Sequence, residues 1–418
     1  MKKVSLTTKP IVTKVDGVNR LIIHIFFAIE YKKEDYVKSI LLNRLLLTQS
    51  KKYDTPEKQK QAMEDAYIIK YDVSRRTLES HRIIQFMLSV PKVGIVDDFT
   101  MDKALEFLHE MIFNPRVENE MFDEKFFNDE KAFLLENQSE FPRDIGDFAY
   151  NEYDKFVDPE EKNLISHETY MKELNKVTAK DVYDYYNRII NNNDYFTLIA
   201  GAVDNEEELI NTYEKYFKQE SKNLNYDFDY FSIEDLLDHE EKTIETKYNQ
   251  SMLFMHFNIK DYKEEEYFKL VTLGWLLDSK ENNLVFHKLR IEHGLVYYCN
   301  CDFNSKFGGF DIITALSYED VDKAKELIIE VIDSLKDEKL FDECKNRTLV
   351  ALEYDLLTEE DNPFSVASNK VTKLIDYRKT IEEELEELKN IKYEDILDLI
   401  NRIINTKVMI IKGGDNHE

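Results

Sequence analysis

The sequence predicts an α+β protein of two homologous domains, each a mostly antiparallel sheet with helices packed on one face. The first observation behind this prediction is an internal repeat whose parts come in the same order in both halves. The second is the separation of short β-rich runs from longer runs with apolar residues at helical spacing. A chain of 418 residues is long enough for two such domains.

The repeat is visible in two pairs of segments. Tyr31–Leu46 matches Tyr262–Leu277 at eight of sixteen positions, and both have the apolar spacing of an amphipathic helix. Val177–Asn191 likewise resembles Ile391–Asn405, and each predicts a helix that ends just before a strand. Because both pairs keep their order, we interpret the chain as a duplicated domain of a little over 200 residues.

The remaining elements complete each half. Strands are predicted at Arg20–Ile29, Tyr67–Arg76, Ile83–Pro91 and Tyr195–Ala202, and in the second half at Met252–Ile259, Asp311–Leu316 and Thr406–Lys412. Further helices are predicted at Asp98–Asn114, Glu120–Ser139, Glu319–Asp337 and Asp342–Leu357. We therefore expect a first domain at 1–219, a polar, acidic linker at 220–243 and a second domain at 244–418.

Composition limits the partners and the compartment. A net charge of −28 excludes a general nucleic-acid binder, because such a chain releases few counterions from phosphates. The sequence has no apolar run of the ~20 residues that a membrane span needs, and its first residues do not resemble a signal peptide. Cys299, Cys301 and Cys344 are an odd number and suggest reduced thiols. We expect a cytoplasmic protein with no nucleic-acid or membrane partner.

The histidines do not form a metal motif. His109 and Glu110 begin an HExxH pattern, but residue 113 is Phe. Glu292 and His293 end an HxxEH pattern, but Leu289 occupies the position of its first histidine. We therefore predict no metal ion in this chain.

The segment Phe286–Tyr297 is the most informative in the chain. It predicts the end of a helix, a stop at Gly294 and then a strand, with Arg290 and Tyr297 on either side of the turn. An Arg fork and a phenol placed together can hold a peptide carbonyl or a developing oxyanion. The alternative is a surface Arg that favours the helix dipole and a Tyr in the core.

The element Leu289-Arg290…Gly294-Leu295-Val296-Tyr297 resembles one in the insulinase-type (M16) metallopeptidase family. The similarity covers nearly the whole chain, and Val177–Ala202 is also typical of the family's first domain. The resemblance implies the metallohydrolase fold of that family, in the form of the bacterial members of about 400 residues with two homologous α+β domains.

In catalytic members the first-domain helix carries an inverted zinc motif, HxxEH, and a further glutamate downstream. The resemblance assigns this motif to residues 40–44 of the helix Tyr36–Leu47, where Ile40 and Arg44 replace the histidines and Asn43 replaces the general base. An alkyl group, a cation and an amide cannot perform those roles. The downstream glutamate corresponds to Glu136, which we interpret as structural. The chain alone is expected to have no catalytic residue.

Some bacterial members of the family work as pairs of unlike subunits, and this sequence resembles the degenerate one. The resemblance implies a heterodimer with a zinc-bearing homologue, which would bind the Zn, while Arg290 and Tyr297 bind peptide substrate. It also implies that peptide is bound as an added strand on a sheet edge, here within residues 67–91. Two alternatives remain: a scaffold protein, as in respiratory complexes, and a peptide-binding, chaperone-like protein with no role in cleavage.

Overall fold

The computed structural model describes residues 2–77, 80–161, 164–190, 194–228, 238–304, 308–359, 362–375 and 379–414. The chain divides into two compact units. The first unit comprises Met1–Glu140, His167–Tyr230 and Thr358–Arg378, and the second comprises Phe141–Ser166, Phe231–Leu357 and Lys379–Glu418. Residues 229–237 of the predicted linker lie outside the described residues.

The first unit is built on a five-stranded sheet in the order β2-β8-β3-β5-β4. Its strands are β2(Ile11–Lys14), β3(Arg20–Glu30), β4(Lys70–Thr77), β5(His81–Pro91) and β8(Tyr195–Gly201). All neighbours are antiparallel except β2 and β8, and β4 is an edge strand. The helices of the unit are α1(Tyr36–Thr48), α2(Pro56–Asp65), α3(Met101–Phe113), α4(Glu124–Gln138), α6(His167–Lys176), α7(Ala179–Ile190) and α8(Glu206–Tyr216).

The second unit repeats this topology, with a sheet in the order β10-β14-β11-β13-β12. Its strands are β10(Glu240–Glu245), β11(Ser251–Ile259), β12(Val296–Asn304), β13(Gly309–Leu316) and β14(Ile403–Lys412). Again only one pair, β10 with β14, is parallel, and β12 is the edge strand that corresponds to β4. Its helices are α9(Tyr267–Leu277), α10(Leu284–Phe286), the π-helix η3(His287–Glu292), α11(Val321–Ser334), α12(Glu338–Glu359), α14(Ile381–Asn390) and α15(Tyr393–Asn401). The predicted fold class is confirmed.

The repeat continues into local detail. The helices α1 and α9 each follow a single 3-10 turn, Lys33–Asp35 or Glu264–Glu266, which leads in from the end of the central strand. Small pairings complete the described fold: β1(Lys2–Thr7) with β9(Asn223–Phe228), and β6(Val117–Glu118) with β7(Met121–Phe122).

The central strands are buried on both faces. Alternate residues of β3, such as Ile23 and Ile25, point into the main core of the first unit beneath the helices, and Met255 and Phe257 of β11 do the same in the second. The residues between them are also buried, including His24 and His256. A strand that is buried on both faces shows a near-continuous apolar run rather than strict alternation, and both strands have such runs.

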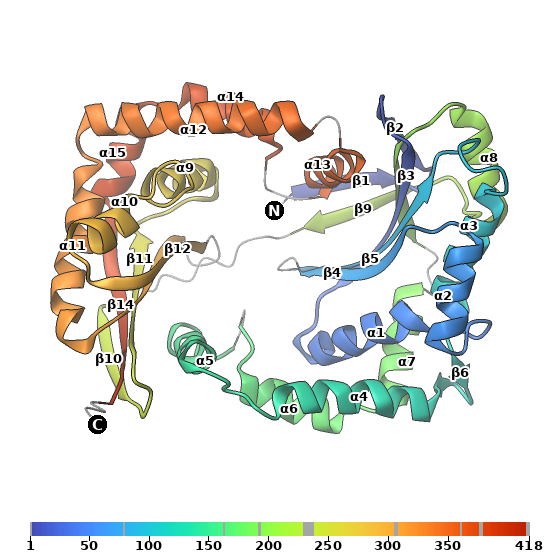
Figure 1. The fold of residues 1–418 in the computed structure, drawn as a ribbon, viewed down its shortest axis with the longest axis horizontal. Coiled ribbons are helices and arrows are strands. Elements are labelled where there is room, and N and C mark those ends of the chain that lie inside the picture. Colours follow the sequence, from blue (N-terminus) through green and yellow to red (C-terminus); the bar gives the residue numbers. More distant parts are fainter. Residues whose placement is uncertain are drawn as a thin grey trace. The chain divides into compact units, whose positions relative to one another are not determined.

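The second face of each sheet is covered by a helix from the other half of the sequence. The helix α5(Ile145–Val157) belongs to the second unit, where Ala149, Tyr153 and Val157 pack on β11, β13 and β14. The helix α13(Pro363–Ile375) belongs to the first unit, where it lies against β8, β3 and β1 (Figure 1). Each sequence half therefore contributes one helix to the other half's sheet.

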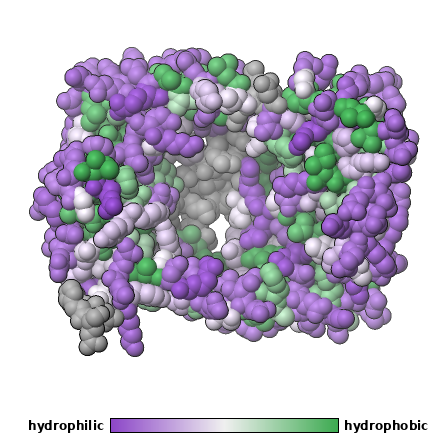
Figure 2. All heavy atoms as spheres, in the orientation of Figure 1, coloured by the Kyte–Doolittle hydropathy of each residue, from purple (hydrophilic) through white to green (hydrophobic). Residues whose placement is uncertain are grey.

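Charged and polar residues form most of the visible surface. On the face drawn in Figure 2, hydrophilic residues predominate and apolar ones are scattered between them. Within the described part of the chain, no helix is both long enough and apolar enough to cross a membrane.

Candidate functional site

Arg290 and Tyr297 lie together at the start of the edge strand β12. The Cζ atom of Arg290 is 5.3 Å from the centre of the Tyr297 ring, a cation–π contact. Its Nη1 atom donates a hydrogen bond of 3.0 Å to the carbonyl oxygen of Val296. Both side chains are exposed, Tyr297 to 68%. An exposed Arg–Tyr pair held by its own backbone can receive a carbonyl or a carboxylate.

The local backbone explains why the pair points outward. Leu289 and Val296, the residues next to Arg290 and Tyr297, are fully buried in the main core of the second unit. Arg290 lies in a π-helical turn, a rare conformation that often marks a functional position. Gly294 then adopts a φ of 68°, which a glycine tolerates without strain, and ends the turn.

Tyr297 itself lies in a β-bulge. The pairing of β12 with β13 joins Val296 to Leu316 and Tyr298 to Ala315, so Tyr297 is the extra residue between them. A bulge changes the direction of a side chain at a sheet edge and is common next to binding sites. The sequence predicted the helix end, the stop and the strand, whereas the π-turn and the bulge came only from the structure.

The three positions that the resemblance assigns to a zinc motif lie on α1 of the first unit. Ile40, Asn43 and Arg44 are all partly buried. The Nε atom of Arg44 is 2.6 Å from the carboxylate of Glu130 on α4, and its guanidinium lies 4.1 Å from the centre of the Phe133 ring. The Oδ1 atom of Asn43 is buried and has no hydrogen-bond partner among the described residues.

These residues do not fit a zinc ion. The set offers an alkyl group, one amide and a guanidinium that already pairs with the nearest carboxylate, where zinc needs imidazole, thiolate or carboxylate ligands. Among the described residues, no group of three or more His, Cys, Asp or Glu could hold a metal ion. Glu136 is exposed, and Glu130, one and a half turns earlier on α4, is the glutamate that contacts α1. Sequence reasoning missed Glu130.

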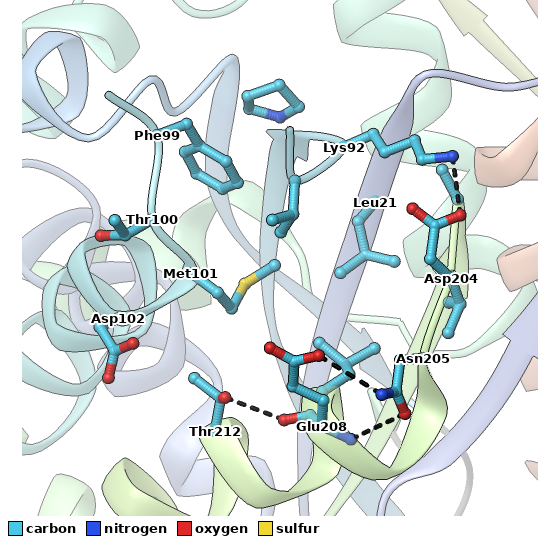
Figure 3. A pocket seen from close by; sticks show the side chains of 15 residues that line it. Leu21, Lys92, Phe99, Thr100, Met101, Asp102, Asp204, Asn205, Glu208 and Thr212 are labelled. Carbon is cyan, nitrogen blue, oxygen red and sulfur yellow. Dashed lines mark hydrogen bonds and ion pairs between the residues drawn. The ribbon is translucent and has the colours of Figure 1, made fainter. Parts of the chain in front are cut away.

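A separate cavity of about 390 Å³ lies at the opposite end of the first sheet, where β5 and β8 end. Its floor is apolar, with Leu21, Phe99 and Met101, as Figure 3 shows. Its rim is polar, and Lys92 lies 2.8 Å from the carboxylate of Asp204. Its lining residues include none of Ile40, Asn43 and Arg44.

Comparison with known proteins agrees with this geometry. Residues 176–348 match the family model described as Peptidase M16 inactive domain. The chain is 19% identical over 389 residues to a protein of Bacillus subtilis (strain 168) named "Probable inactive metalloprotease YmfF", and the alignment covers 92% of this chain and 90% of that protein.

Two solved structures share the fold. A conserved protein from Enterococcus faecalis V583 superimposes with a TM-score of 0.82 at 17% identity, over 100% of both chains. A peptidase M16 inactive domain from Pseudomonas fluorescens superimposes with a TM-score of 0.70 at 13% identity, over 98% of this chain and 97% of that one.

The two homologous α+β units of this chain thus have the fold of the solved peptidase M16 inactive domain. The resemblance to the M16 family that the sequence predicted is thus confirmed, because this chain is similar to proteins described as an inactive M16 domain or a probable inactive metalloprotease.

Proposed function

We propose that this chain is the non-catalytic subunit of a two-subunit peptidase, in which a zinc-bearing M16 homologue cleaves small peptides or peptide precursors. In this proposal the partner binds the Zn and provides the attacking hydroxide. Arg290 and Tyr297 bind the peptide backbone and stabilise charge on the carbonyl as it becomes tetrahedral. The compartment we propose is the cytoplasm.

One observation carries the proposal. Arg290 and Tyr297 are both present, in contact and exposed, although Ile40, Asn43 and Arg44 of α1 offer no zinc ligand. An arginine that only stabilised a helix end would not need a phenol beneath it in a β-bulge. A scaffold would have no use for either group. The pair is also rigid, because Leu289 and Val296 anchor it, and rigid donors contribute most to catalysis.

The test is turnover by the reconstituted pair. The chain is mixed with its zinc-bearing homologue, and cleavage of an unstructured peptide is measured for wild type, Arg290→Ala and Tyr297→Phe. Loss of a donor to the developing charge is expected to lower kcat by about 10²–10³-fold. Arg143 and Tyr354 are exposed residues of the same types in the second unit, so Arg143→Ala and Tyr354→Phe are matched controls. Both variants should keep full turnover.

The alternatives give different results in the same experiment. Full turnover in both Arg290→Ala and Tyr297→Phe removes the proposed role. Peptide binding without cleavage by the pair indicates a peptide-binding protein, and a stable complex without binding indicates a scaffold. The chain alone should cleave nothing and retain no stoichiometric zinc after dialysis; either activity or bound zinc contradicts our interpretation of Ile40, Asn43 and Arg44.

A further inference from the structure

Arginines and tyrosines gather where α1 meets the edge of the first sheet. Arg75 of β4 and Arg82 of β5 lie on the face of the sheet that carries the main core. Each is two positions from a core residue on its own strand, Val73 or Ile84, and residues two apart on a strand point to the same face. The guanidinium groups of both residues lie against the ring of Tyr36, so the two cations share one aromatic neighbour. Like charges that lie against the same ring repel each other, which makes the arrangement costly without an anion.

Aromatic rings surround these cations. The Cζ atom of Arg75 is 5.7 Å from the centre of the Tyr36 ring. Arg82 lies 4.8 Å from the ring of Tyr31 and 5.8 Å from that of Tyr36. Tyr170 of α6 meets Tyr36 edge to face at 6.3 Å. Tyrosine faces stabilise guanidinium groups, but they do not neutralise them.

Arg82 is a buried cation without a carboxylate partner in the described part of the chain. Its side chain is 1% exposed, and Nη1 donates to the hydroxyl of Ser39 at 3.0 Å. Its Nη2 atom and the buried hydroxyl of Tyr185 have no hydrogen-bond partner among the described residues. Burial is the main cause that lowers the pKa of Arg82, yet an arginine remains charged in proteins.

Two carboxylates that contact α1 or precede it are already paired with other cations. Glu130 pairs with Arg44, and Asp35 pairs with Lys38 and Arg188. In the described part of the chain, neither Arg75 nor Arg82 has an Asp or Glu within ion-pair distance. Among the residues that the structure describes, no carboxylate pairs with the two positive charges of this cluster, in a chain whose net charge is −28.

A ligand can reach this place from the sheet edge. β4 is the edge strand, so its outer backbone groups have no strand beside them in the first sheet. Arg75, Tyr36, Ile40 and Tyr170 are each partly exposed there. A peptide added to β4 as an extra strand would run directly past Arg75.

We propose that Arg75, Tyr36 and Tyr170, with Arg82 beneath them, form a carboxylate-binding subsite for a peptide docked on β4. Arginine matches a carboxylate with two parallel hydrogen bonds. A polyanion is excluded because the strongly acidic surface repels it, whereas a single carboxylate enters at little cost.

The inference rests on the proposed function in one respect, that the ligand is a peptide; it needs no partner subunit and no cleavage. Two sources have the required chemistry, an acidic side chain and the carboxyl terminus of the peptide. Three otherwise identical ten-residue peptides distinguish them: one with a central Glu and an amidated C-terminus, one with Gln and an amidated C-terminus, and one with Gln and a free C-terminus.

The experiment measures binding of these peptides to the chain alone by fluorescence anisotropy at low ionic strength. We expect one of the two carboxylate peptides to bind about tenfold more tightly than the Gln amide, since a desolvated ion pair contributes about that factor. The preference should shrink as salt rises. Arg75→Gln should abolish it, and the neighbouring Arg76→Gln, on the other face of β4, should preserve it.

Equal binding of all three peptides, binding of none, or a preference that survives Arg75→Gln overturns this inference. Circular dichroism of each variant checks that it folds. Arg290→Ala should leave the carboxylate preference unchanged, because that residue lies in the other unit. If the carboxylate preference holds while Arg290→Ala and Tyr297→Phe keep full turnover with the partner, only the proposed function fails. If the preference is absent while both substitutions lower turnover, only the carboxylate subsite fails.

Discussion

The guanidinium of Arg290 lies over the ring of Tyr297 and donates to the carbonyl of Val296, the residue just before that tyrosine. The two side chains thus contact each other across the six residues that separate them in the sequence. Their positions depend on the buried neighbours Leu289 and Val296, whereas their own tips are exposed. Substitutions at the exposed tips should therefore change peptide turnover with little effect on the free energy of unfolding.

The first prediction concerns this separation of turnover from stability. Tyr297→Phe should change the free energy of unfolding by less than about 0.5 kcal/mol, because the side chain is exposed. Arg290→Ala should cost about 1 kcal/mol through its hydrogen bond to Val296. The adjacent Leu289→Ala should cost about 2–5 kcal/mol, since it empties a fully buried position. Urea denaturation measures all three, and a cost for Tyr297→Phe equal to that of Leu289→Ala would contradict an exposed site.

The second prediction concerns Arg44 of α1, which the resemblance assigns to a zinc-ligand position. Arg44→Ala should lower the free energy of unfolding by about 1–3 kcal/mol, because it leaves the mostly buried carboxylate of Glu130 without its cation and removes the contact with Phe133.

Lys52→Ala is the matched control for Arg44→Ala. Lys52 pairs with Glu106 at the same 2.6 Å, but both groups are more than half exposed, so its loss should cost well under 1 kcal/mol. Equal effects of the two substitutions would show that Arg44 is only a surface residue. Thermal unfolding at pH 7 is the measurement.

The third prediction concerns acid stability. Burial lowers the pKa of His24 to about 4 from an ordinary 6.5, and the Nδ1 atom already accepts a hydrogen bond of 2.7 Å from Gln85. The unfolded chain therefore takes up this proton more readily than the folded one. The stability associated with neutral His24 is complete above pH 6.5 and is lost as the pH falls toward 4, by about 3 kcal/mol.

His24→Asn tests this, because it removes the titrating group and keeps an acceptor for Gln85. The difference in unfolding free energy between wild type and variant should change by about 3 kcal/mol between pH 7 and pH 4. Other groups, including Asp154, whose burial raises its pKa to about 6 with the opposite sign, cancel in that difference. A pH-independent difference between wild type and His24→Asn would refute the assignment.

The fourth prediction concerns α5, the helix from the first half of the sequence that packs on the sheet of the second unit. The buried hydroxyl of Tyr153 donates to the carboxylate of Asp311 on β13, and the same carboxylate lies 2.7 Å from Nδ1 of the buried His256. Tyr153→Phe should cost about 1–3 kcal/mol because it leaves a buried carboxylate with one partner fewer. It should also speed amide hydrogen exchange in α5. Tyr354→Phe, at 67% exposed, should do neither.

Much of the fold could be predicted from the sequence because its signals are local or repeated. The match of Tyr31–Leu46 with Tyr262–Leu277 predicted two like units, and both segments are helices that start at the equivalent tyrosines Tyr36 and Tyr267. The helix end, the glycine stop and the strand around Arg290 were predicted from neighbouring residues alone. The roles assigned to Arg290 and Tyr297 stay predictions until the variants are measured.

The sequence by itself determined that the chain is duplicated, that α1 has no side chains able to bind zinc, and that Arg290 and Tyr297 are separated by one turn, since composition and spacing decide each of these. Only the tertiary structure decided that α5 and α13 cover the sheet of the opposite half, that Glu130 pairs with Arg44, and that Arg75 and Arg82 meet beside Tyr36. An apolar helix face predicts burial but does not identify the sheet that buries it. Contacts between residues far apart in sequence, 86 positions for Arg44 and Glu130, have no local signal from which they could be predicted.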